Sequence, residues 1–440
     1  MTDPALHGNN KHISFAWFRR LLARTSWTVL DQALLAFANF AGNVVLARWL
    51  TPVQYGGFMA ASALFWMVLN VYGGLIPEPM MVFGSNRFRD RLSSYFTVLT
   101  TFHLGISAVI SAGLAVTGFA LMLRGSPAPG SSILGYAIAC PTLLLLWLAR
   151  RAVYLRSSPR LAAVAGGIYM VGTLAILDVF YSTATLSSFT APLAGAGASA
   201  LAILIVIIAI RPFQIWVPWP RDFMRTVAIA HWHYGRWSVM AAMTSWAPTA
   251  VYYLLIMPVW VGLQGNAALN ALWNLVMPAI QVGLALSLLL IPAFSRARDE
   301  GRASVLMWSA LLTMVAGAAL YALVIDLAGE PVMDLVYGGR YTQFSHFAWV
   351  VGIAALPNAA IAVLESALRA HQRPDIILWA YVASTAVTCV FGPVAVAAWG
   401  VLGGTLGLLV RDVTTMLVEL WWVRRVVGSS NPQATGRLST

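Results

Sequence analysis

Charged residues are scarce in this chain, and lysine is almost absent. Only 10% of the 440 residues are charged, whereas 60% are hydrophobic. Lys11 is the single lysine among the 27 basic residues. A soluble domain carries about 25% charged residues, so a chain this apolar could not cover its surface with polar atoms in water. The composition therefore predicts an integral membrane protein whose apolar surface faces lipid.

Patterns that would bind a metal or support catalysis are also missing from the sequence. Cys140 and Cys389 both lie in apolar runs, which gives neither a disulfide framework nor a zinc spacing. His231 and His233 are two residues apart, so they would point to different faces of a helix. The sequence contains no Gly-rich phosphate loop and no nucleophile motif. We expect no metal, no cofactor and no enzymatic activity.

Long apolar runs dominate the rest of the sequence, and a bilayer crossing takes about 20 residues. An offset of 210 residues aligns Trp27 with Trp237 and Asn39 with Thr249, as an internal repeat would. We predict an all-α membrane protein with about 12 transmembrane helices, in two pseudo-symmetric six-helix lobes around a central cavity. The runs cover residues 27–48, 56–77, 95–122, 132–150, 161–181, 188–210, 237–258, 267–292, 304–327, 344–367, 375–397 and 399–422.

The basic residues predict which helix ends face the cytoplasm. An N-terminus on the inside puts 23 basic residues inside and only 3 outside, namely Arg48, Arg124 and Arg340. Cytoplasmic loops carry such an excess of Arg and Lys. The net charge of +12 thus comes from small clusters between apolar runs, and nucleic-acid binding is not expected. We predict a multi-pass protein of the bacterial cytoplasmic (inner) membrane, with both termini in the cytoplasm.

A polar segment between the sixth and seventh runs divides the chain. It contains tryptophans beside arginines, which suits a helix lying in the membrane interface. The predicted organisation is a cytoplasmic or interfacial N-terminal segment at 1–26, an N-terminal lobe at 27–210, a cytoplasmic interfacial linker at 211–236, a C-terminal lobe at 237–423 and a cytoplasmic tail at 424–440.

Polar side chains follow one face of three predicted helices. With about 100° between successive residues, the polar positions of the first, seventh and eighth helices each occupy a narrow arc. Such groups are costly against lipid, so these faces should line a substrate-binding cavity. The alternative is ordinary hydrogen bonding between helices, worth about 0.6 kcal/mol per contact. The candidate residues are Gln32, Asn39 and Asn43 of the first helix, Thr249 and Tyr253 of the seventh, and Asn270, Asn274 and Gln281 of the eighth.

Ionisable side chains within the runs are rarer, since each costs about 2.5–3.5 kcal/mol at a helix centre. Asp31 shares the polar face of the first helix and is the candidate for coupling transport to an ion; the alternative is a structural, hydrogen-bonding carboxylate. Arg411, near the middle of the last helix, either binds an anionic substrate group or pairs with Asp412 or Glu365. Glu419 lies near the predicted cytoplasmic end, where we expect it to reach water.

Two further arginines lie at the predicted cytoplasmic mouths of the first and seventh helices. These are Arg24 and Arg236. A guanidinium group can hold two phosphate oxygens at once, so both are candidates for contacting a substrate phosphate. The excess of basic residues in cytoplasmic loops would also account for them.

Three short segments resemble a known transporter family. They are LARWLTPVQYGGF at 46–58, PVMDLVYGGRYTQ at 331–343 and LRAHQRPD at 368–375. Their order and spacing resemble those of lipid-linked oligosaccharide and polysaccharide flippases of the O-antigen translocase type, in the multidrug/oligosaccharidyl-lipid/polysaccharide exporter superfamily. The resemblance implies two lobes around a cavity that opens alternately to each side. It also implies cationic cavity residues that meet a pyrophosphate, whereas the first helix here has Asp31 and no Arg at mid-depth.

We therefore predict a flippase that moves a polyprenyl-pyrophosphate-linked oligosaccharide from the cytoplasmic to the outer leaflet, for surface lipopolysaccharide or exopolysaccharide biosynthesis. Its expected partners are that lipid-linked oligosaccharide and membrane lipids, with the polysaccharide polymerase and glycosyltransferases as further candidates. One alternative is a cation-coupled small-molecule or multidrug antiporter of the same superfamily. A membrane enzyme of polysaccharide assembly is less favoured, because the predicted outside loops are short.

Overall fold

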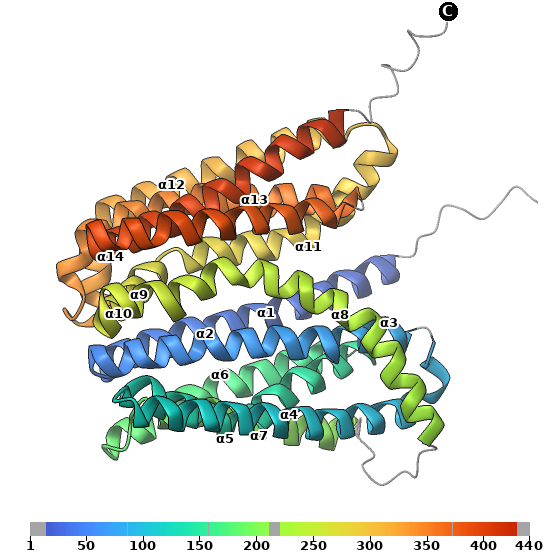
Figure 1. Ribbon diagram of the computed structural model, residues 1–440. Helices are drawn as coiled ribbons and strands as arrows, with labels where there is room; N and C mark the ends of the chain where they lie inside the picture. Colours follow the sequence, from blue (N-terminus) through green and yellow to red (C-terminus); the bar gives the residue numbers. More distant parts are fainter. Residues whose placement is uncertain (1–14, 86, 157, 211–220, 372, 429–440) are drawn as a thin grey trace, which may run out of the picture.

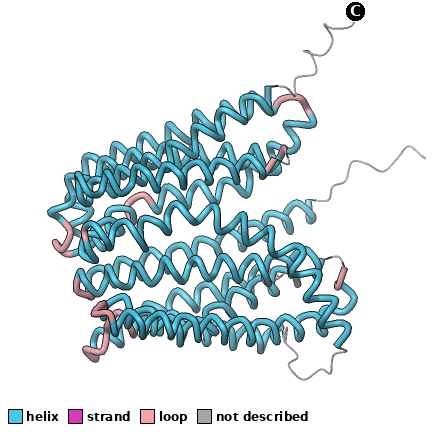
Figure 2. Tube along the Cα trace, viewed as in Figure 1, coloured by secondary structure: helices cyan, strands magenta, loops and turns pink. Residues whose placement is uncertain are grey.

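The computed structural model in Figure 1 describes residues 15–85, 87–156, 158–210, 221–371 and 373–428. Within these ranges the regular structure is entirely helical (Figure 2). The apolar composition and the helical backbone belong together, because a helix satisfies its own N–H and C=O groups where no water is available. The predicted all-α class is confirmed.

The N-terminal lobe is built from the first seven helices. They are α1 (Phe15–Trp49), α2 (Pro52–Leu75), α3 (Pro77–Ser85), α4 (Leu92–Leu123), α5 (Pro127–Leu155), α6 (Pro159–Ser182) and α7 (Thr190–Ile210), with a 3-10 turn at Arg89–Arg91.

The C-terminal lobe is built from the remaining helices. They are α8 (Arg221–Val251), a π-helical turn (Tyr252–Ile256), α9 (Met257–Trp260), α10 (Gly262–Trp273), α11 (Met277–Asp299), α12 (Ala303–Tyr337), a 3-10 turn (Thr342–Phe347), α13 (Ala348–Ala370) and α14 (Pro374–Gly428).

Every predicted run overlaps the observed helices over most of its length, although two crossings are interrupted. By length and hydropathy, the described residues hold 10 helices able to cross a membrane, or up to 11 with α10 and α11 counted as one span bent by 52°. The 55-residue α14 contains two crossings, because its chain reverses at Gly400 (φ 57°, ψ −126°). The reversal is tight, since a Cβ atom on Gly403 would overlap the carbonyl oxygen of Ala395. Counting the bent pair as one span and α14 as two gives the predicted number of about 12 spans.

The predicted segment boundaries differ from the observed helix boundaries. The described part of the predicted N-terminal segment belongs to α1, which begins at Phe15. Residues 211–220 of the predicted linker lie outside the described residues, and 221–236 form the first half of α8. Trp232 on this half and Trp237 just after it are 60% and 62% exposed, which suits an interface position.

The two lobes meet at one end of the bundle and diverge toward the other (Figure 1). We call the end where α1 begins and α14 ends the inner end, because the charge distribution predicts it to be cytoplasmic, and the opposite end the outer end. At the outer end α2 packs against α10 of the other lobe. Asn266 donates a 3.3 Å hydrogen bond to the carbonyl oxygen of Gly56. A Cβ atom on Gly56 would overlap the carbonyl oxygen of Leu263, so only glycine permits this approach.

The sequence segments 46–58 and 331–343 come together at this outer contact. In the first, Thr51 and Gln54 form a capping box that begins α2 at Pro52. In the second, Gly338 adopts a left-handed conformation (φ 60°) that ends α12. Arg340 then donates to the carbonyl oxygen of Leu50 across the two lobes. Segments almost 300 residues apart thus hold the outer end closed.

The glycine contact can be tested on stability. We expect Gly56→Ala to lower the thermal unfolding temperature of the detergent-solubilised protein, because a crowded core site costs about 1–3 kcal/mol. Gly73→Ala on the same helix is the matched control, since no described atom lies within 4 Å of a Cβ there. Equal unfolding temperatures for the two variants would contradict the close approach of α2 and α10.

Candidate functional site

A cavity of about 170 Å³ lies inside the N-terminal lobe. We call it the deep cavity; α1, α2, α5, α6 and α7 form its walls. Asn39 and Asn43 of α1 line it, as does Arg150 of α5. Aromatic side chains supply much of the remaining wall: Phe58, Phe65, Trp66, Tyr136, Trp147 and Tyr169.

A second cavity, of about 530 Å³, lies beside the first and nearer the inner end. We call it the inner cavity; its polar lining includes Asn70, Glu78, Arg151 and Tyr234. Trp66, Leu69 and Trp147 line both cavities. Because α2 runs from the outer to the inner end, the two cavities follow one another along this helix. Trp66 and Trp147 stand at the boundary between the two cavities, and each cavity has some polar lining.

Asp31 lies next to Arg150, a lining residue of the deep cavity, and accepts two short hydrogen bonds. Its Oδ2 accepts from Nη2 of Arg150 at 2.5 Å and from the hydroxyl of Tyr154 at 2.5 Å. Asp31 is 0% exposed, and its Oδ1, which faces Gly166 of α6, has no hydrogen-bond partner among the described residues. Arg150 also lies 5.7 Å from the ring centroid of Trp147. The carboxylate and the cation therefore neutralise each other within the lobe.

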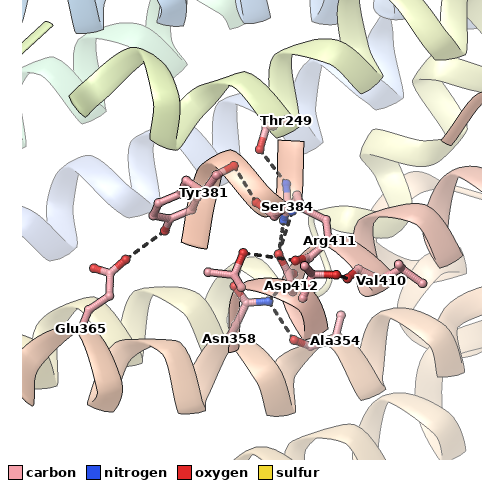
Figure 3. Close-up of polar contacts among 11 residues, drawn as sticks. Thr249, Ala354, Asn358, Glu365, Tyr381, Ser384, Val410, Arg411 and Asp412 are labelled. Atoms are coloured by element: carbon pink, nitrogen blue, oxygen red, sulfur yellow. Dashed lines mark hydrogen bonds and ion pairs between the residues drawn. The ribbon is translucent and has the colours of Figure 1, made fainter. Parts of the chain in front are cut away.

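A second buried ion pair lies in the C-terminal lobe (Figure 3). The Arg411 guanidinium lies 2.6 Å from Oδ1 of Asp412 and donates to the hydroxyl of Thr249 at 2.6 Å. Asn358 of α13 donates to the other oxygen of Asp412 at 2.7 Å. Of the alternatives for Arg411, the structure shows the pairing with Asp412. The pair and its donors join α8, α13 and α14, so removing either charged partner would leave the other buried without compensation.

The other predicted cavity residues do not gather at one place. Asn270 donates to the hydroxyl of Tyr55 across the lobe contact. Asn274 and Tyr253 are buried, whereas Gln281 is exposed.

Three predicted residues lie nearer the inner end. Gln32 is exposed and donates weakly to Asp31 at 3.4 Å. Arg236 is exposed, with its guanidinium 5.4 Å from the ring centroid of Trp237. Arg24 belongs to α1, but its side chain lies outside the part that the structure describes. The polar faces of the three helices are thus divided among the deep cavity, the lobe contact and the C-terminal ion pair.

Sequence reasoning missed the residues of α5. Arg150 counted only as one of many cytoplasmic arginines, yet it lies 4% exposed beside Asp31, which is 119 residues away in the chain. Trp147 precedes it by one helical turn and forms the junction of the two cavities. Arg150 is the last residue of the predicted run 132–150 and is followed by Arg151, so its position in the sequence resembles that of the other basic residues at helix ends.

The Asp31 pair predicts a stability pattern. Arg150→Gln should lower the free energy of unfolding by about 3–5 kcal/mol, because it leaves the carboxylate buried without its cation. Adding Asp31→Asn should recover a large part of this loss. Arg151→Gln is the control, since the Arg151 side chain is exposed. Thermal unfolding of the purified variants measures this; a double variant as unstable as Arg150→Gln would show that the pair is not the cause.

The fold corresponds to that of known transporters, although searches against protein-family models and curated proteins found no match. The inward-facing structure of a multidrug resistance MATE family transporter of the MOP superfamily matches with a TM-score of 0.72 and 13% identity, over 93% of this chain and 99% of that one. The lipid II flippase MurJ, in an inward closed conformation, matches with a TM-score of 0.71 and 11% identity, over 94% and 91%. An outward-facing MATE structure of the MOP superfamily gives 0.56 at 14% identity, over 94% and 96%. This chain therefore shares the fold of these transporters, and it superposes better on the inward-facing MATE structure than on the outward-facing one.

Proposed function

We propose that this protein is a flippase that moves a polyprenyl-pyrophosphate-linked oligosaccharide from the cytoplasmic to the outer leaflet by alternating access. The observation that carries the proposal is the pair of neighbouring cavities in series along α2, both lined by Trp66 and Trp147. A lipid-linked head group is long, and it needs a continuous path rather than one compact pocket.

The chemistry of the path suits a sugar head group. Indole rings offer flat apolar faces together with a polar N–H, and sugar rings present both C–H faces and hydroxyls. Asn39 and Asn43 add amide donors and acceptors to the deep cavity. These groups would let the oligosaccharide exchange water for protein contacts on entry.

The pyrophosphate would be met at the inner cavity. Arg151 lines this cavity with an exposed side chain, whereas Arg150 and Arg411 are committed to ion pairs. An arginine can grip phosphate oxygens in a bidentate manner. Arg24 and Arg236 would assist nearer the inner end, and the polyprenyl tail would stay in lipid.

The proposal includes a cellular setting. The protein would lie in the bacterial cytoplasmic membrane with both termini inside, and it would serve surface polysaccharide biosynthesis. Glycosyltransferases would supply its substrate, and a polysaccharide polymerase would consume its product.

A cation-coupled small-molecule antiporter is the second candidate, and Asp31 is the observation in its favour. This carboxyl group is fully buried near the deep cavity and has one oxygen without a partner. Asp31→Asn should then abolish the dependence of transport on a proton or sodium gradient. A retained dependence would remove Asp31 from coupling.

Gene deletion separates the two candidates. For a flippase, the deletion mutant should lose surface polysaccharide and accumulate the lipid-linked repeat in the inner leaflet. Normal polysaccharide together with sensitivity to small toxic compounds would instead identify an antiporter. Arrival of an unpolymerised repeat in the outer leaflet would favour an enzyme of assembly.

The tryptophan junction gives a residue-level prediction. Trp66→Ala and Trp147→Ala should reduce export severalfold, because each removes a stacking surface common to both cavities. Trp379→Ala is the matched control, since Trp379 lies 64% exposed on the outside of α14. Complementation of the deletion strain, scored as surface polysaccharide per amount of protein in the membrane, measures the effect. An equal loss in all three variants would contradict the path.

A further inference from the structure

Glu419 is a buried carboxyl group for which the proposed function has no role. Sequence position led us to expect that it reaches water, and this expectation is wrong because its exposure is 0%. Neither of its oxygens has a hydrogen-bond partner in the described part of the chain. Asp31 and Asp412, by contrast, each face an arginine and at least one further donor. Glu419 therefore differs in kind from the other two buried acids.

The surroundings of Glu419 are apolar on one side. Val423, one turn farther along the helix, is fully buried in a cluster that includes Leu364 and Leu368 of α13. An ionised carboxylate in such a place lacks both water and donors, which is strongly unfavourable. The neutral acid avoids most of this cost. The packing thus favours a bound proton on Glu419 in the arrangement seen here.

On its other side Glu419 meets a polar group of three residues. Glu365 and Arg369 of α13 are close enough to interact with it electrostatically, and so is Tyr381 on the first arm of α14. Tyr381 donates to one oxygen of Glu365 at 2.9 Å, and Arg369 donates to the other at 2.6 Å. Figure 3 shows the contact between Tyr381 and Glu365. From α11, Arg298 reaches the same end of the lobe and donates to the carbonyl oxygen of Ala370 at 2.7 Å.

This polar group connects Glu419 with the inner surface. The Arg369 side chain is 52% exposed, that of Glu365 is 16% exposed, and Glu419 is fully enclosed. Exposure thus falls step by step from the surface to the buried acid. Glu365 accepts hydrogen bonds from two donors, whereas Glu419 accepts none from the described residues.

We infer that Glu419 is a proton-binding site of the C-terminal lobe, separate from Asp31, and that it exchanges its proton with the inner side through Glu365 and Tyr381. Loss of the proton would place a second negative charge beside Glu365, which already pairs with Arg369. Proton binding and release therefore change the charge balance at the inner end of α13 and α14, where the lobe ends diverge.

Chemical labelling tests the site without any transported substrate. N,N′-Dicyclohexylcarbodiimide reacts with protonated carboxyl groups in apolar surroundings and leaves a stable acylurea that peptide mass spectrometry locates. In the full-length protein in lipid vesicles at neutral pH, we expect labelling at Glu419 that falls as the pH is raised. Absence of label on Glu419 at neutral pH, in protein that labels elsewhere, would overturn the proposal.

Two variants and one salt exchange sharpen the result. Glu365→Gln should reduce labelling of Glu419 severalfold at the same pH, because the ionised form then no longer faces a like charge. Glu330→Gln on α12, an exposed position, is the control and should leave the labelling unchanged. Replacing choline by sodium at constant ionic strength should also leave it unchanged. A decrease in the labelling of Glu419 in sodium would overturn the proton site in favour of a metal cation. Equal labelling of Glu419 in Glu365→Gln and in the unchanged protein would exclude Glu365 from the site.

Sided vesicles test the route. In sealed vesicles of known orientation, a pH step on the inner side should alter labelling of Glu419, and the same step on the outer side should not. The opposite response would refute exchange through Glu365. Since no substrate is involved, failure here leaves the flippase proposal standing, and failure of the export experiments leaves the proton site standing.

Discussion

The cost of an unpaired charge in a bilayer governs how the interior of this protein is arranged. Asp31 meets Arg150, and Asp412 meets Arg411, in two separate lobes. A neutral donor completes each pair, Tyr154 of α5 for Asp31 and Asn358 of α13 for Asp412. Removing either charged partner would therefore leave the other charge buried without compensation in a medium of low dielectric. The same requirement explains why the polar residues of the predicted helices lie in different places. Some form hydrogen bonds between helices, and the others line the cavities.

A close backbone contact complements these charges at the outer end. Gly56 lets α2 touch α10, and the lobes close there while they diverge toward the inner end. The inner cavity then lies toward the end where the lobes diverge. The close spacing of α2 and α10 at the outer end therefore depends on Gly56, which has no side chain.

Hydropathy and charge were sufficient to predict the twelve crossings, because bilayer thickness imposes helix length directly. Side-chain placement was harder. The π-helical turn at Tyr252–Ile256 changes the angle between successive residues, so the arc calculated for Thr249 and Tyr253 does not continue through it. Arg150 meets Asp31 only through tertiary packing, which no local pattern encodes. Glu419 was misjudged because distance from the helix end says nothing about the neighbouring helices that cover it.

The reversal at Gly400 fixes the lengths of the two arms of α14. Tyr381 lies 19 residues before Gly400, and Glu419 lies 19 residues after it, so both reach the same depth. A helix rises about 1.5 Å and turns about 100° with each residue. Deleting a single residue from one arm would therefore turn Glu419 or Tyr381 toward a different neighbour. The depth of that side chain in the membrane would change by only about 1.5 Å. The number of residues between Gly400 and each of these side chains therefore determines which neighbours the side chain meets. This number matters more than the identity of the apolar residues in the two arms.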